Sequence, residues 1–456
     1  MQKGDILTLD ITSVGMNGEG IGRVDNFVVF VDGAMQGEEV KAQVLQVKKS
    51  FCNAKVIKVI SPSSDRVQPP CKVCFKCGGC EMQHISYAKQ LEIKRDRVKS
   101  CLERECKMQF NVDETVASPQ VFYYRNKIQL PISFQDGKLV GGYFAPNSHK
   151  VVAFCRQGES GICHLNCDGM QDIIDTFLDY MHAEGISHYD ENSHSGTIRH
   201  LVIRKVGDKF AICVVVNGQS LKSHGKLVNA LKAKGFDFSL YLSSNTHRTN
   251  VIMGDKVTVL YGEESLQGET LGVKYQVSPL SFMQVNDGVR DMIYAKVGSI
   301  IKDSGISNVI DAYSGVGIMS NIFAKYADKV YAIEIVRQAI DNSIQLAKLN
   351  GNEDKIINVC GDCAEELPKV IAKLKDKGSI VVLDPPRKGC DKRVLDALLY
   401  ALPDKIIYVS CNPATLARDV KFLLSQYDVE SVTPYDMFPQ TKHIETLICL
   451  KRKQPK

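Results

Sequence analysis

The chain has 456 residues, of which 44% are hydrophobic and 24% are charged, and its formal net charge is +5. This length exceeds one ordinary hydrophobic core, so we expect two or three domains. The composition is typical of a globular protein, and the absence of a run of about 18 apolar residues predicts no membrane span. Since the N-terminus lacks the apolar segment of a secretory signal, we expect a cytoplasmic protein. No exposed apolar stripe stands out in the sequence, which favours a monomer.

Residues 1–60 alternate short apolar runs with glycine turns, a pattern typical of a small β-barrel. The apolar runs are 6–9, 27–31, 39–47 and 54–60. A glycine-rich stretch from Gly15 to Arg23 lies between the first two runs. Five-stranded barrels of this kind commonly bind oligonucleotides on one face. Seven acidic residues balance the seven basic residues of this segment, so any RNA contact must come from the placement of these charges. The alternative is a barrel that acts only as a spacer.

Four cysteines lie within ten residues directly after a proline-rich linker at 61–70: Cys71, Cys74, Cys77 and Cys80. Structural zinc sites usually use two separated pairs of ligands. The dense spacing, with two glycines before Cys80, favours an iron–sulfur cluster instead. Zinc and the absence of any metal remain alternatives. The other cysteines of this 16-cysteine chain are expected to stay reduced, mostly as small buried side chains.

The next segment predicts a basic helix and then a mixed α+β region. From Lys89 to Lys107 seven basic residues outnumber four acidic ones, which suits RNA binding, although an ordinary solvated helix face also explains it. Strand-like runs are 127–134, 151–154, 201–206, 210–216 and 257–261, with helical stretches at 168–184 and 221–234. Residues 123–127 join aromatic to basic side chains, a composition that suits stacking on bases. A buried aromatic pair beside an exposed Arg125 is the alternative.

From about residue 280 the pattern changes to alternating strands and helices. The predicted strands are 308–312, 329–334, 355–361, 379–384 and 405–410. Regular alternation of this kind predicts a doubly wound, mainly parallel sheet. The fold class is therefore α/β at the C-terminus. We expect three domains: an OB-like barrel at 1–60, a mixed α+β domain at 70–275 and a catalytic domain at 280–456.

Polar residues at the strand ends predict a nucleoside cofactor. Asp311 to Gly317 follows the first strand of this region, and Gly315 lets the backbone approach a ligand. Glu334 ends the next strand, where a carboxylate can bind ribose hydroxyls. Asp362 is placed to reach an adenine amino group, and Asp384 ends the fourth strand. Because a loop that wraps a pyrophosphate is absent, S-adenosylmethionine fits better than a dinucleotide.

Cys411 and Glu445 predict the reaction. Carbon 5 of uracil becomes nucleophilic when a thiolate adds to C6, and a base must later remove the C5 proton. Cys411 would be the nucleophile and Glu445 the base, while Asp384 would contact the substrate or the cofactor amino group. Arg387 disfavours amino-group methylation, because those enzymes place an aromatic residue there. Cytosine-C5 enzymes carry a cysteine directly after the fourth strand's proline, and Pro385-Pro386 has none.

The chain resembles the RNA uracil-C5 methyltransferase family, specifically its TRAM-containing branch that acts on 23S ribosomal RNA. The motifs that carry the resemblance are Gly18 to Arg23, the cysteine cluster, Ser281 to Asn286, Asp311 to Gly317, Asp384 to Gly389, Ser410 to Pro413 and His443 to Glu445. The resemblance implies a TRAM barrel, a class I methyltransferase sheet, S-adenosylmethionine and a single-stranded or flipped uridine. It places Gln284, Tyr313, Glu334 and Asp384 at the cofactor. Ser314 departs from the family, which often has Cys there.

The resemblance also implies a [4Fe–4S] cluster held by Cys71, Cys77, Cys80 and Cys163. Cys74 is then an extra thiol, and it remains a possible fourth ligand; Cys155 and Cys167 are rivals to Cys163. Two other functions stay open. One is a tRNA uridine-C5 methyltransferase, although those relatives usually lack the barrel and the cluster. The other is a non-catalytic iron–sulfur protein that binds RNA or acts as a sensor.

Overall fold

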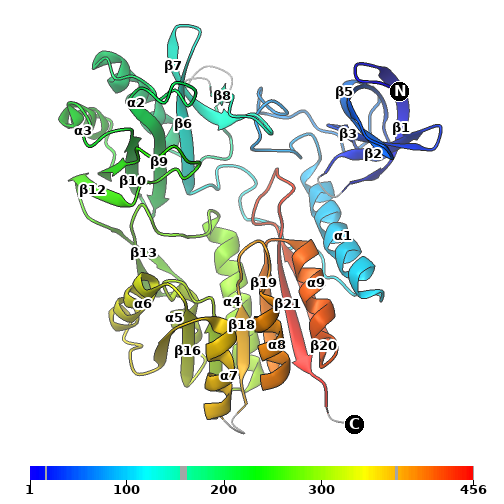
Figure 1. Ribbon diagram of the computed structural model, residues 1–456, viewed down its shortest axis with the longest axis vertical. Coiled ribbons are helices and arrows are strands. Elements are labelled where there is room, and N and C mark those ends of the chain that lie inside the picture. Colours follow the sequence, from blue (N-terminus) through cyan, green and yellow to red (C-terminus); the bar gives the residue numbers. More distant parts are fainter. Residues whose placement is uncertain (16–17, 155–161, 375–377, 455–456) are drawn as a thin grey trace.

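The computed structural model describes residues 1–15, 18–154, 162–374 and 378–454. The N-terminal barrel lies beside a mixed central sheet, and both lie over one end of the catalytic sheet (Figure 1). Among the helices of these ranges, none has the length and apolar character that a membrane crossing needs.

The N-terminal strands close into a barrel in the order β1-β2-β3-β5-β4. Their bounds are β1 (Ile6–Val14), β2 (Gly20–Val24), β3 (Phe27–Asp32), β4 (Glu39–Val47) and β5 (Phe51–Ser61). Residues 20–23 of the glycine-rich stretch therefore belong to strand β2, which the sequence pattern did not predict. Glycine is required there because a Cβ on Gly22 would lie 2.5 Å from the Asp10 carbonyl oxygen. The expected five-stranded barrel is confirmed.

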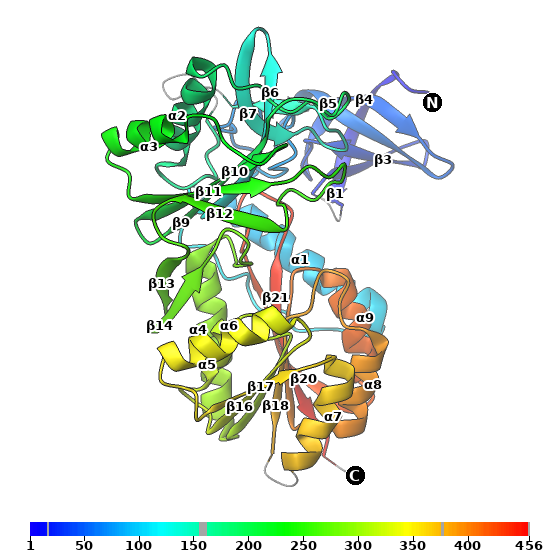
Figure 2. The same ribbon diagram turned by 60° about the vertical axis from the view of Figure 1, so that its left-hand side comes forward.

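The central sheet has the strand order β12-β11-β10-β9-β6-β7-β8. The bounds are β6 (Lys127–Gln135), β7 (Lys138–Phe144), β8 (Val151–Ala153), β9 (Ile198–Val206), β10 (Lys209–Val216), β11 (Phe238–Ser244) and β12 (Lys256–Tyr261). Helices α2 (Met170–Ala183) and α3 (His224–Ala233) pack on one face through a shared apolar cluster. The hairpin β13 (Leu266–Thr270) and β14 (Val273–Val277) leads to the catalytic sheet, as Figure 2 shows. Strands β7 and β11 were missed by the sequence pattern.

The catalytic sheet has the order β17-β16-β15-β18-β19-β21-β20. Its strands are β15 (Asn308–Ala312), β16 (Lys329–Glu334), β17 (Ile356–Cys360), β18 (Ile380–Leu383), β19 (Lys405–Ser410), β20 (Tyr427–Tyr435) and β21 (Glu445–Arg452). Strands β15 to β19 are parallel, and β21 inserts antiparallel between β19 and β20. The chain order reverses between β15 and β18, the position where such sheets bind ligands.

Helices cover both faces of the catalytic sheet (Figures 1 and 2). One face carries α4 (Asp287–Ser304), α5 (Ile318–Phe323) and α6 (Arg337–Leu349), and the other carries α7 (Cys363–Leu374), α8 (Lys392–Ala401) and α9 (Pro413–Leu423). Two buried apolar clusters lie under these two sets of helices. The predicted doubly wound α/β sheet is confirmed.

Helix α1 (Tyr87–Cys106) joins the catalytic part and not the central sheet. Its buried residues Val98, Cys101 and Leu102 belong to the apolar cluster that also contains α8 and α9. The expected segment 70–275 therefore does not pack as one body, because the apolar face of α1 is covered by α9. We keep the division into three parts as a proposal, with α1 assigned to the catalytic part.

Candidate active site

Cys411 lies at the corner between β19 and α9. The Asn412 side chain accepts a hydrogen bond from the Ala414 amide at 3.1 Å, and so caps α9. Ser410 pairs with Thr446 across the antiparallel strands β19 and β21. Cys411 directly follows Ser410 and Glu445 directly precedes Thr446, so both residues lie at this end of the two strands, where the Glu445 charge acts on the Cys411 thiol. The structure thus brings together the two predicted catalytic residues.

The surroundings of Cys411 keep its thiol protonated at neutral pH. Burial raises the pKa of Cys411 to about 11, with a further increase from the Glu445 carboxylate, while the Arg387 guanidinium lowers it. A thiol must lose its proton to act as a nucleophile. Arg387 is therefore a further candidate for the site, although in the sequence it served only to disfavour amino-group methylation. Its signal was its place in the Asp384–Gly389 motif.

Glu445 is buried without a partner for one of its oxygens. Glu445 is the first residue of β21 and is 2% exposed. None of the described residues gives Oε2 a hydrogen bond. Burial raises the pKa of Glu445 well above its usual value, Asp384 adds to this increase, and Arg387 opposes it. A carboxylate in such surroundings is a strong proton acceptor.

Asp384 directly follows β18, the strand that pairs with β19. Burial raises the pKa of Asp384 to about 6. Its charge raises the pKa values of both Glu445 and Cys411. The three groups therefore lie close enough to influence one another, at the carboxyl ends of β18 and β19 and at the start of β21.

The predicted cofactor loop follows β15. The Gly315 amide donates a hydrogen bond to Glu334 Oε2 at 3.1 Å, and the Val336 amide donates to Glu334 Oε1 at 2.8 Å. Tyr313 has a φ of +68°, an unusual conformation for a residue with a side chain. A Cβ on Gly315 would meet no atom within 4 Å, so the loop faces open space at this point. These contacts fix the Glu334 carboxylate beside the loop.

Asp311 lies in β15 just before this loop and connects the strand to α5, the helix that follows the loop. It is 0% exposed, and its Oδ2 accepts a hydrogen bond from Ser320 Oγ of α5 at 2.5 Å. In the described part of the chain, Oδ1 has no partner. Burial raises the pKa of Asp311 to about 7, although the Ser320 hydrogen bond lowers it. The geometry suits a support for the loop better than an exposed ligand contact.

Asp362 and Gln284, two other predicted cofactor contacts, both take part in hydrogen bonds within the protein. Asp362 accepts hydrogen bonds from the Ala364 amide at 2.9 Å and from Arg393 at 2.8 Å, so an adenine amino group would share this carboxylate with Arg393. Gln284 lies in the loop before α4, where its carbonyl accepts a hydrogen bond from Asn126 at 3.1 Å. Phe282 in the same loop is 80% exposed. Phe282, which no sequence pattern singled out, offers an exposed aromatic surface to a planar group.

The clustered cysteines line one pocket. It has about 360 Å³ of empty space, part of it open to solvent. The thiol residues that line it are Cys71, Cys74, Cys77, Cys80 and Cys163. The structure therefore brings Cys163 to the cluster across a long stretch of sequence. Cys167 is absent from the described lining of the pocket, and Cys155 lies outside the described residues.

A single metal ion does not fit these thiols as they stand. Within the described ranges, no three His, Cys, Asp or Glu side chains are placed to hold one ion. A zinc ion needs its thiolates at about 2.3 Å from one point. An iron–sulfur cluster is larger, so its ligands lie farther apart around a wider space. Five of the residues that line the pocket are cysteines, and thiol ligands suit this second kind of group.

The two predicted RNA-contact segments are largely engaged within the protein. Tyr123 is exposed, whereas Tyr124 is buried and donates a hydrogen bond to the Pro439 carbonyl at 3.1 Å. The Arg125 backbone pairs with Leu165 and Cys167 beside the cysteine pocket. On α1, several basic side chains pair with acids of the same chain. These pairs favour the reading of α1 as an ordinary helix face.

Comparisons with known proteins agree with this geometry. The sequence profile of the tRNA (Uracil-5-)-methyltransferase family matches residues 214–453, and that of the TRAM domain matches residues 1–57. The chain belongs to the tRNA (Uracil-5-)-methyltransferase family. An uncharacterized RNA methyltransferase of Clostridium tetani is 37% identical, covering 99% of this chain and 97% of the relative. One of Halalkalibacterium halodurans is 36% identical, with 99% and 98% covered.

A solved structure is similar over nearly the whole chain. It is the Pyrococcus abyssi tRNA (uracil-54, C5)-methyltransferase in complex with S-adenosyl-L-homocysteine, with a TM-score of 0.77 and 26% identity. The match covers 97% of this chain and 100% of that one. The expected family, fold and enzyme class, an S-adenosylmethionine-dependent RNA uracil-5-methyltransferase, are confirmed. Membership of an enzyme family argues against the non-catalytic alternative.

Proposed function

We propose that the enzyme methylates uridine C5 in RNA through a covalent bond between Cys411 and C6 of the base. The observation that supports this proposal is that Cys411 and Glu445 flank the last pair of the β19–β21 ladder, Ser410 and Thr446, and that the Glu445 charge acts on the Cys411 thiol. In the proposed reaction the Cys411 thiolate adds to C6, and the electron pair gained at C5 takes the methyl group of S-adenosylmethionine. S-adenosylhomocysteine leaves. Glu445 then removes the C5 proton, and the C5–H electrons re-form the double bond and expel the thiolate.

The cofactor is proposed to lie between the loop at Tyr313–Gly315 and the Glu334 carboxylate. Two backbone amides already orient both Glu334 oxygens, which leaves their remaining lone pairs for ribose hydroxyls. Asp384 is proposed to contact the uracil ring or the cofactor amino group. Gln284 and Asp362 remain proposed contacts, with Asp311 as the support beneath the loop.

Substituting Glu445 and Cys411 tests the mechanism. With Cys411→Ala, no methylation should remain, because no group is left to add to C6. With Glu445→Gln, methyl transfer should still occur, but the adduct should persist because its C5 proton stays in place. A covalent protein–RNA band on a denaturing gel, dependent on S-adenosylmethionine, measures this. Unchanged methylation by Cys411→Ala would overturn the mechanism.

We propose 23S ribosomal RNA as the substrate, on the family resemblance of the barrel and cysteine cluster. A tRNA substrate is the second candidate, and the Pyrococcus abyssi protein is named for that activity. Because that match covers 97% of this chain, the barrel by itself does not argue against tRNA, contrary to the sequence-based expectation. Tritium release from [5-³H]uridine in ribosomal RNA and tRNA transcripts distinguishes the two. Release from tRNA alone would replace the ribosomal assignment.

The cysteine pocket is proposed to hold a [4Fe–4S] cluster through Cys71, Cys77, Cys80 and Cys163. Methyl transfer moves no net electrons, so the group would shape the fold or the RNA surface. Anaerobic preparations should contain about four iron atoms per chain. Cys163→Ser should lower the iron content, whereas the control Cys167→Ser should not. A preparation without iron would reject the cluster, and equal iron loss in Cys74→Ser would make Cys74 a ligand.

A further inference from the structure

The loop at residues 436–444, between β20 and β21, leads directly into Glu445. Most of this loop is buried: Asp436, Met437, Pro439, Gln440, Thr441 and Ile444. Loops usually lie on the surface, because buried backbone groups need hydrogen-bond partners. A buried loop before the proposed base therefore requires donors and acceptors from other parts of the chain.

Carbonyl groups along the loop accept hydrogen bonds from distant side chains and one distant amide. For the carbonyls of residues 437, 438, 439, 440 and 442, the donors are in turn Asn286 Nδ2 at 3.2 Å, Lys94 Nζ at 3.1 Å, the Tyr124 hydroxyl at 3.1 Å, the Met82 amide at 3.0 Å and Arg97 Nη1 at 2.6 Å. Two of these donors are on α1. Helix α1 therefore holds the loop from one side.

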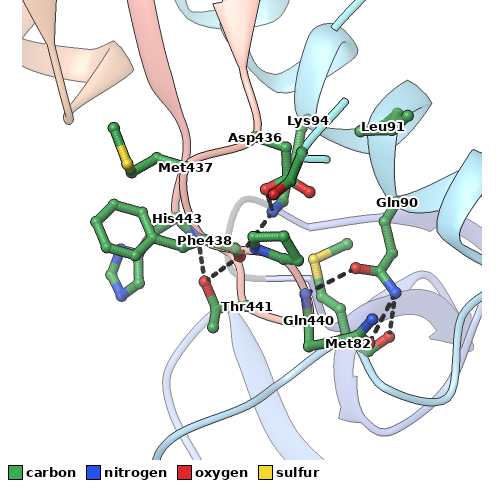
Figure 3. A network of polar contacts seen from close by, with 12 residues as sticks. Met82, Gln90, Leu91, Lys94, Asp436, Met437, Phe438, Gln440, Thr441 and His443 are labelled. Atoms are coloured by element: carbon green, nitrogen blue, oxygen red, sulfur yellow. Dashed lines mark hydrogen bonds and ion pairs between the residues drawn. The ribbon is translucent and has the colours of Figure 1, made fainter. Parts of the chain in front are cut away.

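Gln90 of α1 and Gln440 of the loop form a reciprocal pair (Figure 3). Gln90 Nε2 donates to Gln440 Oε1 at 3.0 Å, and the Gln440 amide donates to Gln90 Oε1 at 3.0 Å. The same Nε2 also reaches the carbonyls of Met82 and Ile85 at 3.1 and 2.9 Å. Gln440 has a φ of +70°, a left-handed conformation that surrounding contacts must hold in place for a residue other than glycine.

Lys94 forms an ion pair with Asp436 at the start of the loop. The distance from Nζ to Oδ1 is 2.5 Å, and the two side chains are 1% and 0% exposed. Figure 3 shows Lys94 between Asp436 and the Phe438 backbone. A buried ion pair is often no more stable than an apolar pair of similar size. Its geometry nevertheless fixes the direction in which the chain leaves β20.

We infer that Gln90 and Lys94 are positioning residues that hold loop 436–444 and thereby aim Glu445 at the C5 proton. This inference rests on the proposed function of Glu445. Neither residue touches the reacting atoms: both act through Gln440, Asp436 and the Phe438 carbonyl. A loosened loop would leave Cys411 in place after β19 but would misplace the base that acts after methyl transfer.

The test separates formation of the adduct from its resolution in single-turnover reactions. We expect Gln90→Leu to form the covalent methylated adduct within about twofold of the wild-type rate and to resolve it at least tenfold more slowly. The double variant Lys94→Met/Asp436→Asn removes both buried charges together, so that neither charge is left buried without its partner. It should show the same two rates as Gln90→Leu. The control is Lys99→Met, the same change at an exposed position of the same helix.

Each outcome decides the inference. Resolution at the wild-type rate in both folded variants would overturn it, as would equal slowing of formation and resolution, which indicates a general structural defect. If Glu445→Gln forms no lasting adduct, the proposed function fails. If it does form one, but Gln90→Leu and Lys94→Met/Asp436→Asn resolve their adducts at the wild-type rate, only the positioning role fails. Persistence of the adduct in the variants but not in Lys99→Met supports the inference.

Hydrogen exchange in the wild-type enzyme gives a second measurement that needs no variant. The amides of residues 436, 437 and 440–443 all have acceptors within the structure. They should therefore exchange as slowly as those of β20 and β21. Exchange at the rate of an unstructured loop would show that these contacts do not hold loop 436–444 in place, and would overturn the inference.

Discussion

At the scale of single residues, Cys411 and Glu445 have to lose protons in surroundings that favour the protonated forms. Burial raises the pKa values of both groups, and each carboxylate nearby adds to the effect. Arg387 is the cation that opposes this increase at both residues. The charge of Arg387 therefore increases the fraction of Cys411 that is thiolate.

Removing the Arg387 charge should shift the pH dependence of adduct formation. Because Arg387 lowers the pKa of Cys411, Arg387→Ala should raise it, so the rate should fall by about tenfold at pH 7 for a change of one pKa unit. The rate should still rise with pH, with its midpoint at higher pH than in the wild type. Single-turnover rates from pH 6 to 10 measure this. Lys388→Ala, an exposed neighbour, is the control, and identical profiles for Arg387→Ala and wild type would contradict the prediction.

Asp311 makes a pH-dependent contribution to stability. Burial raises the pKa of Asp311 from 3.8 to about 7, so the folded state holds this proton more tightly than the unfolded state. The contribution is fully present below about pH 4 and is lost as the pH rises through about 7. Relative to wild type, Asp311→Asn should therefore become more stable between pH 5 and 8, by up to a few kcal/mol. Urea unfolding at the two pH values measures the difference, and a pH-independent difference would contradict this.

At the scale of elements, the corner between β19 and α9 joins helix capping to the geometry of the site. Asn412 caps α9 through its oxygen, and its Nδ2 donates to the Arg387 carbonyl at 3.2 Å. The same side chain thus connects the ends of β18 and β19. Another helix of the catalytic part has a comparable cap: Asp391, at the start of α8, accepts a hydrogen bond from the Arg393 amide at 2.9 Å.

The two caps allow a matched comparison. Asn412→Ala and Asp391→Ala should each cost about 1 kcal/mol of unfolding free energy, because each leaves a helix amide without its acceptor. Only Asn412→Ala should also slow adduct formation, since it releases the Arg387 loop. Urea unfolding and single-turnover rates measure the two effects. Equal rates in the two variants would show that Asn412 is only a cap.

At the scale of the whole molecule, a buried ion pair attaches the barrel to the segment that leads to the cysteines. Glu38 of the barrel is buried and accepts from Arg66 Nε at 2.5 Å and Nη2 at 2.8 Å. Arg66 also donates to the Gly33 carbonyl at 2.7 Å. Arg66 also pairs with Ile85 shortly before α1, so the attachment links the barrel to the helix that packs on the catalytic part, which matters if one RNA contacts both.

Breaking this attachment should affect RNA binding more than catalysis. Arg66→Ala leaves Glu38 buried without its partner, which costs about 3–5 kcal/mol locally, so the KM for a long RNA should rise while kcat stays near the wild-type value. The double variant Glu38→Gln/Arg66→Met should recover part of the loss. Steady-state kinetics with a long RNA and with a short oligonucleotide measure this. A fall in kcat with unchanged KM would contradict a role in binding.

The sequence by itself determined the class of fold and most of the candidate chemistry. Strands β15, β16 and β19 have the predicted bounds, because a buried parallel strand is a continuous apolar run that ends in polar residues. Cys411 and Glu334 were found for the same reason, since each follows such a run. These features depend on residues that are near one another in the chain.

Only the tertiary structure decided how distant segments meet. It placed α1 on α9, Cys163 at the cysteine pocket, and Lys94 beside Asp436, 342 residues away. It also inserted β21 between β19 and β20, which brings Glu445 to Cys411. Local periodicity carries no information on such contacts, because burial of an apolar face or a charge can be satisfied by many partners. The packing of the complete chain selects the one that is formed.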